Sequence, residues 1–449
     1  MKVVNRKESW LLLFGDILVF IFSLWLSLFF RSGEIPSQVV FEDHLLPFSI
    51  LFAVWCLIFF IAGLYEKHTT IFKRRLPLRV LNTQIFNIFL SVIFFYFIPY
   101  FGITPKTILF IYLFVSSASI FVWRIYGQKI FGLKNLEEAM ILGRGPELDL
   151  LLREVNDNPH YGLKFVSVYD LDKSVGVDFK KDILEKIKSL DISVVVMDLQ
   201  NENLKKNFSS FYNLIFSDIH FVNINNLYEE IFDRVPLTLV GYDWFLENIS
   251  LAPRPVYDFL RRSVDICLAI LLLPVFCLAY VFVWVIKKIE DSRSIMIFQE
   301  RIGHNGKIIK IAKFRTWLYD DAGNEEAKKN NKITKIGNFL RKMRIDELPQ
   351  VWDVLKGNLS FIGPRPELPV LVKVYEQEIP YYGIRHLVKP GLSGWAQLLQ
   401  DNPPKHDANY NDTKVKLSYD LYYIKNRSLV LDLKIALKTL RAIFSRSGR

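Results

Sequence analysis

Long apolar runs alternate with short polar segments over the first 125 residues of the chain. The runs cover residues 10–30, 46–64, 80–101 and 107–123, and each is close to the ~20 residues that a helix needs to cross a membrane. The first run is longer than the apolar part of a signal peptide and lacks a small-residue cleavage site, so we expect it to stay on the chain. The pattern predicts a four-helix transmembrane domain over residues 1–135.

The loops between these runs predict how the helices are oriented. Lys and Arg concentrate on the cytoplasmic side of membrane proteins. The first and third loops hold one basic residue each, Arg31 and Lys106. The basic residues of the second loop are Lys67, Lys73, Arg74, Arg75 and Arg79. Both ends of the four-helix unit should therefore face the cytoplasm.

A fifth apolar run, residues 264–286, has Pro274 near its middle and basic residues on both flanks. Its length alone fits a fifth crossing. A crossing would place the basic C-terminal part outside the cell, against the charge rule, and a proline removes a backbone donor and kinks a helix. A hairpin that enters one leaflet and returns satisfies both observations. We therefore expect a re-entrant membrane hairpin over residues 253–290, broken at Pro274.

Between these membrane segments, residues 136–252 alternate strand-like and helix-like patterns. The strings EEAMIL, LKFVSVYD, DISVVVMDLQ and DIHFVNINNL read as buried strands, and this alternation predicts a small Rossmann-like α/β domain. Gly143 and Gly145 precede a helix with Pro146 in its first turn, but Leu148 stands where a dinucleotide fingerprint needs its third glycine. We expect a structural or regulatory turn, and nucleotide binding remains the alternative.

The composition agrees with a membrane protein that carries a basic soluble part. The 449 residues are 51% hydrophobic and 15% aromatic, which excludes a disordered or collagen-like chain. The net charge is +11, and after Ile286 there are 30 Lys and Arg against 18 Asp and Glu. No base-reading module accompanies this charge, so membrane attachment explains it more simply than nucleic-acid binding. The three cysteines lack the spacing of a disulfide framework or zinc site.

Two strand-like segments surround Asn305-Gly306 between residues 298 and 316, a typical hairpin turn. Lys313 and Arg315 stand at alternate positions of the second strand, so both side chains should project from one face. Such a pair suits a diphosphate. A solvated basic strand face is the plainer alternative.

Adjacent carboxylates, Asp346 and Glu347, come just before Pro349 and an apolar helical run. Acids in this position are common at helix starts. They could equally provide a nucleophile, since carboxylates attack phosphorus in aspartyl-phosphate enzymes. Together they could also hold Mg²⁺, which proteins bind through one or two carboxylates plus substrate phosphates.

Arginines add positive charge near these acids. Arg365 lies between two prolines in the string GPRP, where a stiff backbone would present its guanidinium to a phosphate. An ordinary proline-rich turn with an exposed arginine is the alternative. Arg301, Arg341 and Arg344 add to the local cationic density.

The last helical segment is basic and amphipathic. Lys434, Lys438 and Arg441 follow helical spacing, opposite the apolar face that Leu433 and Leu440 help to form. Such a helix could lie on an anionic membrane surface. It could equally cap the core of the C-terminal domain, and the pattern does not favour either.

Taken together, these strings resemble the bacterial sugar transferases, the polyprenyl-phosphate hexose-1-phosphate transferases of the monotopic phosphoglycosyl transferase superfamily. The resemblance extends from Tyr257 to about Leu440, and the N-terminal parts resemble the long form of the family. The strings that carry it are Lys313-Phe314-Arg315-Thr316, Asp346-Glu347-Leu348-Pro349-Gln350, Gly363-Pro364-Arg365-Pro366, Lys389-Pro390-Gly391, Gly394-Trp395-Ala396-Gln397 and Tyr419-Asp420-Leu421-Tyr422-Tyr423.

Three positions depart from the pattern of the family. Trp317 replaces the usual Met, Asn330-Asn331-Lys332 replaces an Asp-Pro-Arg, and Arg293-Ser294 replaces a Gly-Pro. None of them removes Asp346 or Glu347. The first two leave the substrate contacts of that region open.

The resemblance implies a fold and a reaction. The fold would be a membrane bundle of four transmembrane helices, a Rossmann-like α/β domain, the re-entrant hairpin and a mostly α catalytic domain over residues 291–449. The substrates would be a UDP-sugar, with UDP-galactose and UDP-glucose as first candidates, and undecaprenyl phosphate. Asp346 would attack the β-phosphorus and release UMP, and Glu347 would assist Mg²⁺. Lys313, Arg315, Arg365 and Arg301 would bind phosphate.

The resemblance also implies a place in the cell and leaves several points open. The enzyme would act at the cytoplasmic face of the bacterial inner membrane, at the first membrane step of an O-antigen, capsule or exopolysaccharide pathway. The N-terminal part could provide a homodimer surface, and the sugar is not determined. A membrane scaffold that senses a nucleotide through the Gly143 turn is the alternative. A multi-spanning transferase would need many more crossings than this chain has.

Overall fold

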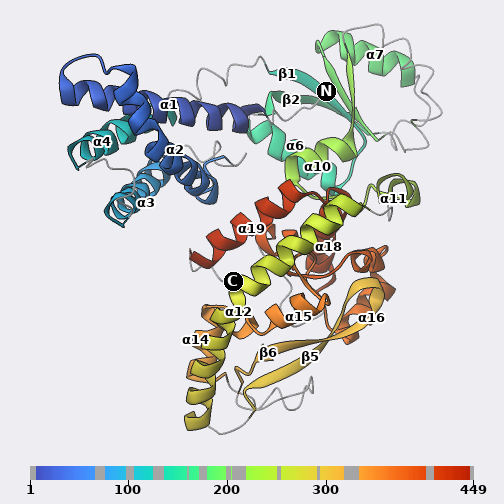
Figure 1. Cartoon of the computed structure of the whole chain (residues 1–449). Coiled ribbons are helices and arrows are strands. Elements are labelled where there is room, and N and C mark those ends of the chain that lie inside the picture. Colours follow the sequence, from blue (N-terminus) through green and yellow to red (C-terminus); the bar gives the residue numbers. More distant parts are fainter. Residues whose placement is uncertain are drawn as a thin grey trace. The chain divides into compact units, whose positions relative to one another are not determined.

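The computed structural model of the chain (Figure 1) forms two compact units, Met1–Ile231 and Phe232–Arg449. It describes residues 7–65, 76–97, 106–124, 136–158, 161–170, 179–198, 204, 219–249, 254–290, 294–317, 333–400 and 409–444. Most of the basic loop of the orientation argument, residues 66–75, lies outside the described residues. The same is true of Arg293 and of residues 330–332.

The first unit opens with the four predicted apolar helices. These are α1 (Lys7–Ser32), α2 (Gln38–Ile61), α3 (Leu76–Phe97) and α4 (Lys106–Val122). Segments of α1, α2 and α3 are long and apolar enough to cross a membrane, and α4 is a shorter apolar helix. Helix α2 begins eight residues before the predicted run because the Ser37 hydroxyl accepts a hydrogen bond from the amide of Val40 and caps it there. The chain is a membrane protein, as predicted.

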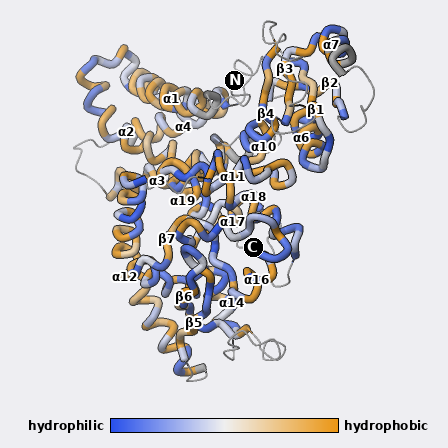
Figure 2. Tube along the Cα trace, turned by 90° about the vertical axis from the view of Figure 1, so that its right-hand side faces the viewer, coloured by the Kyte–Doolittle hydropathy of each residue, from blue (hydrophilic) through white to orange (hydrophobic). Residues whose placement is uncertain are grey.

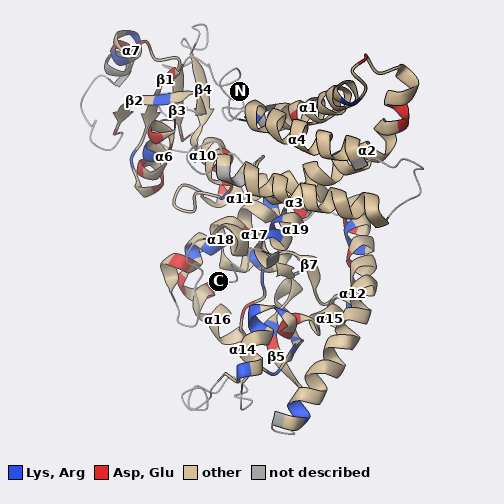
Figure 3. Cartoon of the chain, turned by 90° about the vertical axis from the view of Figure 1, so that its left-hand side faces the viewer, with Lys and Arg blue, Asp and Glu red and all other residues tan. Residues whose placement is uncertain are grey.

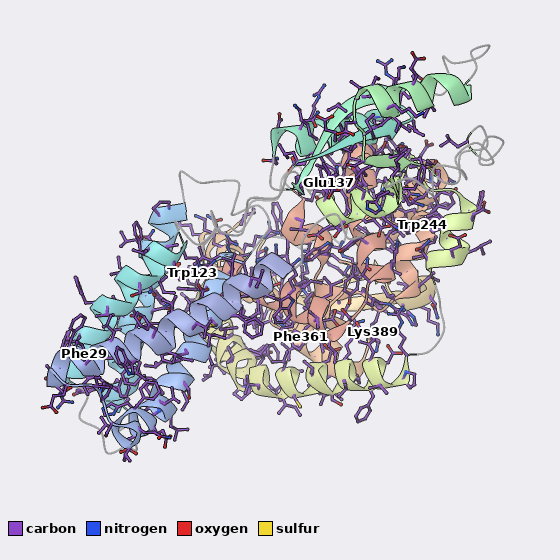
Figure 4. All side chains as sticks on the ribbon, turned by 90° about the horizontal axis from the view of Figure 1, so that it is seen from above. Phe29, Trp123, Glu137, Trp244, Phe361 and Lys389 are labelled. Atoms are coloured by element: carbon purple, nitrogen blue, oxygen red, sulfur yellow. The ribbon has the colours of Figure 1, made fainter. Side chains whose placement is uncertain are left out.

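Aromatic side chains fill the core of this bundle. The ring of Phe20 lies 5.1 Å from that of Trp55, and Tyr112 stacks on Trp55 at 5.6 Å. Aromatic pairs at such distances contribute beyond the area that they bury. Position 15 has to be glycine, because a Cβ there would stand 2.0 Å from the indole of Trp123, which is labelled in Figure 4. The absence of a side chain therefore lets the end of α4 approach α1.

A buried ion pair connects three segments of the bundle. Asp16 of α1 pairs with Arg124, and both side chains are fully buried. The Tyr65 hydroxyl donates to the same carboxylate at 2.6 Å, and Arg124 Nη1 donates to the Leu64 carbonyl at 2.9 Å. Charges are costly in an apolar environment unless they are paired and hydrogen-bonded. The pair therefore specifies how α1, the end of α2 and the end of α4 meet.

Replacing Arg124 by Met should destabilise the bundle by about 3–5 kcal/mol, because Asp16 would stay buried without its counter-charge. The double variant Asp16→Leu, Arg124→Met should lose much less, since it removes both charges. Thermal unfolding in detergent measures the difference. Equal losses in the two variants would contradict this account of the pair.

A parallel sheet follows the bundle within the first unit. Its strands are β1 (Glu137–Leu142), β2 (Leu163–Tyr169), β3 (Val194–Met197) and β4 (His220–Asn223), in the order β2-β1-β3-β4. Helix α6 (Pro146–Asp157) connects β1 to β2, α7 (Phe179–Ser189) connects β2 to β3, and α10 (Ile224–Phe232) follows β4. The connection from β1 to β2 through α6 runs in one direction along the sheet, and the connection from β2 to β3 through α7 runs in the opposite direction past β1. Because such crossovers are right-handed, α6 and α7 lie on opposite faces of the sheet. The predicted strands are confirmed, and the closer Rossmann-like likeness stays a prediction.

The glycine turn after β1 is built as a tight backbone turn. Gly143 and Gly145 have φ angles of 130° and 156°, which favour glycine. The Leu148 side chain lies against this turn, 3.2 Å from where a Cβ on Gly143 would stand. Leu148 thus fills space beside the turn, which agrees with the structural interpretation of the motif.

The second unit carries the longest helix, α12 (Pro255–Glu290), which contains Pro274. The predicted break at Pro274 is wrong, because the helix continues through this residue. Figure 1 shows instead that α12 bends partway along its length, as expected where a proline removes a backbone hydrogen bond. Only 11% of the most apolar stretch of α12 is buried. The hydrophobic residues along this helix are orange in Figure 2. That both ends lie on one side of the membrane stays a prediction.

The rest of the second unit packs around α12 and a central core. The predicted hairpin is confirmed as antiparallel β5 (Met296–Ile302) and β6 (Ile308–Phe314), joined by η6 (His304–Gly306). The other described elements are α11 (Tyr242–Asn248), α14 (Lys335–Lys342), η7 (Ile345–Glu347), α15 (Gln350–Lys356), β7 (Ser360–Ile362), α16 (Pro369–Glu378), η8 (Tyr382–Leu387), β8 (Gly391–Ser393), α17 (Trp395–Leu399), α18 (Tyr410–Lys425) and α19 (Leu429–Phe444).

Two segments join this core in ways that the sequence left open. Trp244 and Phe245 of α11 are buried in it, although α11 precedes the predicted domain boundary at residue 252. Ile435 of α19 is fully buried in the same core, so α19 caps the core, which is one of its two predicted roles. Leu433 of α19 is 59% exposed, and contact with a membrane stays a prediction.

Candidate active site

Asp346 and Glu347, hereafter the acidic pair, lie on the short helix η7 between α14 and α15. Arg344 precedes η7 in a left-handed conformation, with φ of 54°, so the chain turns sharply as it leaves α14. Ile345 and Leu348 flank the acidic pair and pack against the cluster that contains Val283 and Phe314. The apolar neighbours thereby fix η7 against α12 and β6, whereas the carboxylates are left to polar partners.

Glu347 is held between two cations that come from distant parts of the chain. Its carboxylate pairs with the Arg365 guanidinium, and Lys313 Nζ lies 3.5 Å from its Oε1. The Glu347 side chain is 17% exposed. Burial alone would raise the pKa of Glu347, but Arg365 and Lys313 outweigh it and lower this pKa to about 2. Glu347 is therefore ionised at any working pH. Figure 3 shows acidic and basic residues together beside α14, α15 and β5.

Asp346 has a different environment from its neighbour. Among the described residues, no hydrogen bond or ion pair engages its half-buried carboxylate. Burial and the adjacent charge of Glu347 raise the pKa of Asp346 to about 6, against the opposing effect of Lys313. Two neighbouring acids whose environments move their pKa values apart are typical of pairs with separate roles. The anchored acid is Glu347, and Asp346 is available to a substrate.

The predicted phosphate-binding residues do not all converge on the acidic pair. Lys313 and Arg365 do, and Arg301 of β5 is close enough to Arg365 for the two charges to interact. Arg315 follows the end of β6, and its guanidinium donates to the main-chain carbonyls of Ser294, at 2.7 Å, and Trp317, at 3.2 Å. Arg315 thus supports the backbone after β6, and its contact with phosphate stays a prediction.

The Arg365 loop, residues 363–366, is fixed by backbone contacts to the segment before and within β8. Gly363 donates to the Ser393 carbonyl at 2.9 Å, and Gly391 donates to the Pro364 carbonyl at 3.0 Å. A Cβ on Gly391 would stand 2.1 Å from the nitrogen of Gly363. The string KPG, which the sequence left without a role, therefore provides a glycine where two main chains touch.

Replacing Gly391 by Ala should destabilise the protein by about 1–3 kcal/mol, because the clash is with backbone atoms that cannot rotate away. The matched control is Gly383→Ala, where the nearest atom to the new Cβ is the end of the flexible Glu376 side chain at 3.5 Å, and its effect should stay within about 0.5 kcal/mol. Thermal unfolding measures both. A Gly391→Ala protein as stable as the control would show that the contact can relax.

Several polar residues that support this site were not predicted. Asp353 of α15 accepts a hydrogen bond at 3.1 Å from the amide of Ala312, next to Lys313, and so ties α15 to β6. Arg385 of η8 donates to the Arg365 carbonyl at 2.9 Å and pairs with Asp420 of α18 at 2.9 Å. Asp420 stands in a string that carries the family resemblance, but no local pattern joins it to Arg385, which is 35 positions away.

The unusual Trp317 takes part in a contact with Arg341 of α14. The Arg341 guanidinium lies 4.8 Å from the centre of the Trp317 ring, a cation–π distance. Arg341 Nε also donates to the Thr316 hydroxyl at 2.9 Å. These contacts orient an otherwise exposed cation on the side of Asp346. The second departure, residues 330–332, lies outside the described residues.

The acidic pair fits a hard divalent cation. The described residues contain no cluster of three or more His, Cys, Asp and Glu side chains that could hold a metal alone. Mg²⁺ does not need such a cluster, since it is usually bound by one or two carboxylates with water and substrate phosphates. The oxygens of Asp346 and Glu347 are donors of this type.

Comparison with known proteins identifies the family. A family model described as bacterial sugar transferase matches residues 256–446. The exopolysaccharide production protein ExoY of Sinorhizobium fredii is 32% identical over 218 residues, which are 44% of this chain and 92% of that protein. The chain belongs to the bacterial sugar transferase family. The resemblance predicted from the motifs is confirmed.

Two longer relatives match more of this bacterial sugar transferase. The UDP-N-acetylgalactosamine-undecaprenyl-phosphate N-acetylgalactosaminephosphotransferase of Aeromonas hydrophila is 37% identical over 260 residues, 57% of this chain and 59% of that protein. The UDP-glucose:undecaprenyl-phosphate glucose-1-phosphate transferase of Escherichia coli (strain K12) is 31% identical over 311 residues, 65% of this chain and 64% of that protein. The chain thus matches less than two thirds of the length of either.

Proposed function

We propose that this protein transfers a sugar 1-phosphate from a UDP-sugar to undecaprenyl phosphate and releases UMP. The observation that carries the proposal is the unequal acidic pair, in which Glu347 is held by two cations and Asp346 is not. Membership of the bacterial sugar transferase family supports it, as do relatives named for undecaprenyl-phosphate phosphotransferase activity. Their names give N-acetylgalactosamine and glucose as sugars, so the donor of this chain is to be sought among such UDP-sugars and UDP-galactose.

Asp346 is the nucleophile in the first step. With its pKa near 6, it is mostly ionised at neutral pH yet less solvated than a surface carboxylate. One of its oxygens forms a bond to the β-phosphorus of the UDP-sugar, and the bond from this phosphorus to the bridging oxygen breaks. UMP leaves with the electron pair of that bond. The product is an aspartyl phosphate that carries the sugar.

The second step returns the enzyme to its starting state. A phosphate oxygen of undecaprenyl phosphate attacks the phosphorus of the aspartyl phosphate, and the bond between this phosphorus and the Asp346 oxygen breaks. Asp346 is again a carboxylate, and the lipid carries a sugar diphosphate. Arg365, Lys313 and Arg301 stabilise the charge of the transferred phosphoryl group in both steps. Arg365 also holds Glu347 in place.

Mg²⁺ is the cation that the acidic pair would hold together with oxygens of the donor diphosphate. When bound, it supplies positive charge that favours the departure of UMP. Asp346 and Glu347 then have a shared role in binding and separate roles in the reaction, since only Asp346 forms a bond to phosphorus.

The membrane places the two substrates on one surface. Ile345 and Leu348 beside the acidic pair pack in the same cluster as Val283 of α12, and α12 leaves most of its apolar surface uncovered. A lipid acceptor can therefore lie along α12 with its phosphate near Asp346. The water-soluble donor would enter from the cytoplasm, which assigns the site to the cytoplasmic face of the bacterial inner membrane. A polysaccharide pathway would use the product.

Purified protein in nanodiscs should release UMP from one donor of a panel of UDP-glucose, UDP-galactose and UDP-N-acetylgalactosamine, in the presence of Mg²⁺ and undecaprenyl phosphate. Asp346→Asn should lower the rate by about 10³-fold or more, because the nucleophile is lost while the size of the side chain is kept. Donor labelled with ³²P at the β-phosphate should label the wild-type protein and not this variant.

The thermal unfolding of Asp346→Asn is the control for folding. A folded wild-type protein that is silent with every donor would favour a membrane scaffold or an untested donor. Full activity of Asp346→Asn would exclude Asp346 as nucleophile.

Removal of divalent cations should abolish UMP release, and added Mg²⁺ should restore it. The reason is that the donor diphosphate and the acidic pair repel each other without a cation between them. Activity is measured after treatment with EDTA and during titration with MgCl₂, with CaCl₂ as a comparison. Unchanged activity in EDTA would contradict the role of the cation.

A further inference from the structure

We propose that Arg385, anchored by Asp420, is a positioning residue that holds the Arg365 main chain so that its guanidinium meets Glu347. The proposal rests on the proposed function for its kinetic consequence, but its structural part does not. Arg385 touches neither the acidic pair nor Lys313 among the contacts of the described residues. It acts through the loop that carries Arg365.

The first observation is the number of different groups that one buried guanidinium joins. Arg385 is 3% exposed. Its Nη2 donates to the Arg365 carbonyl at 2.9 Å and its Nη1 to the Tyr382 hydroxyl at 2.7 Å. The Nε and Nη2 atoms both donate to one oxygen of Asp420, at 3.1 and 2.9 Å. A planar fork with five donors makes these bonds at once, and a lysine could not.

The second observation is the place of the anchor. Asp420 is 1% exposed on α18, between core residues such as Leu417 and Leu421. The carboxylate that orients Arg385 is therefore fixed to the most buried part of the second unit. The contacts run from α18 through Arg385 to the Arg365 carbonyl, and from the Arg365 guanidinium to Glu347.

The third observation is that the Arg365 loop has few other side chains that fix it. Among the described residues, the other hydrogen bonds to the main chain of residues 363–366 are made with the backbone of Gly391 and Ser393, and Arg261 donates to the Ile362 carbonyl just before the loop. Glu367, just beyond the loop, lies 3.5 Å from Arg385 Nη1 and also pairs with Lys416, so the segment is held by Arg385 on both sides of Pro366. The Arg365 carbonyl and the Glu367 carboxylate both contact Arg385, so this one side chain fixes the end of the loop that leads toward α16.

A buried ion pair is weak evidence for stability, because desolvation offsets the attraction of the charges. A stabilising role alone would not require the bond from Arg385 to a main-chain carbonyl next to the site. Positioning explains it, since a displacement of about 1 Å at a reacting centre can cost about 10²-fold in rate.

The test compares Arg385→Lys and Asp420→Asn with Tyr423→Phe. The control removes a buried hydroxyl on the same helix, which donates to Asp432 at 3.0 Å and makes no hydrogen bond to the Arg365 loop within the described part of the chain. Hydrogen exchange is measured on peptides that contain Gly363 and Gly391. The amides of these two glycines donate the hydrogen bonds that join the Arg365 loop to β8. Both amides should exchange at least tenfold faster in the two variants and not in the control, at matched global stability. Unchanged exchange in the variants would overturn the proposal.

The kinetic arm measures kcat/KM for the UDP-sugar. Arg385→Lys should lower it by about 10- to 100-fold, and so should Arg365→Lys. Because both changes act through the same guanidinium, the double variant should lose little more than Arg365→Lys alone. Losses that multiply would mean that Arg385 acts independently of Arg365, against the proposal. A wild-type protein without activity would remove the proposed function, whereas the exchange measurement would still decide whether Arg385 holds the loop.

Discussion

A buried carboxylate needs a counter-charge, and the arrangement of the C-terminal unit follows from how Glu347 obtains one. Glu347 lies on a short helix whose neighbours are apolar, and water reaches little of its side chain. Its charge is kept by Arg365 and Lys313, which come from a loop and a strand on either side of it in the sequence. The side chains of Lys313 and Arg365 can reach Glu347 only if their backbones are held in place. The strand β6 and the Arg365 loop are therefore fixed by contacts of their own.

The elements that deliver these cations are tied together mainly through main-chain atoms. Asp353 binds the amide next to Lys313, and the glycines around β7 and β8 let two backbones touch beneath Arg365. Glycine at these positions reflects close approach of chains and not mobility. The same dependence on absent side chains recurs in the membrane bundle, where Gly15 admits the indole of Trp123.

The membrane helices and the site have one physical feature in common, which is a buried carboxylate that is paired with a cation. In the bundle, Asp16 and Arg124 neutralise each other and join α1 to the ends of α2 and α4. At the site the pairing is unequal, because Glu347 has two cations, whereas within the part of the chain that the structure describes Asp346 has no cation as a direct partner. This inequality moves the two pKa values apart, and the proposed nucleophile is the carboxylate that lacks a counter-charge.

Local patterns in the sequence were enough for the apolar helices, the strands, the Asn305-Gly306 hairpin and the acidic pair, because each is encoded within a few consecutive residues. They failed at Pro274, where α12 continues through the residue, because a proline inside a helix can remove one backbone hydrogen bond and bend the helix without ending it. They also could not separate Lys313 from Arg315. Strand alternation puts both on one face, but β6 ends at Phe314 and the Arg315 guanidinium turns to backbone carbonyls. Only the tertiary structure decided which cations meet Glu347, since Lys313 and Arg365 are 34 and 18 residues away from it in the sequence. It also decided that Asp420, 35 residues away, orients Arg385. Such pairings depend on how distant elements pack.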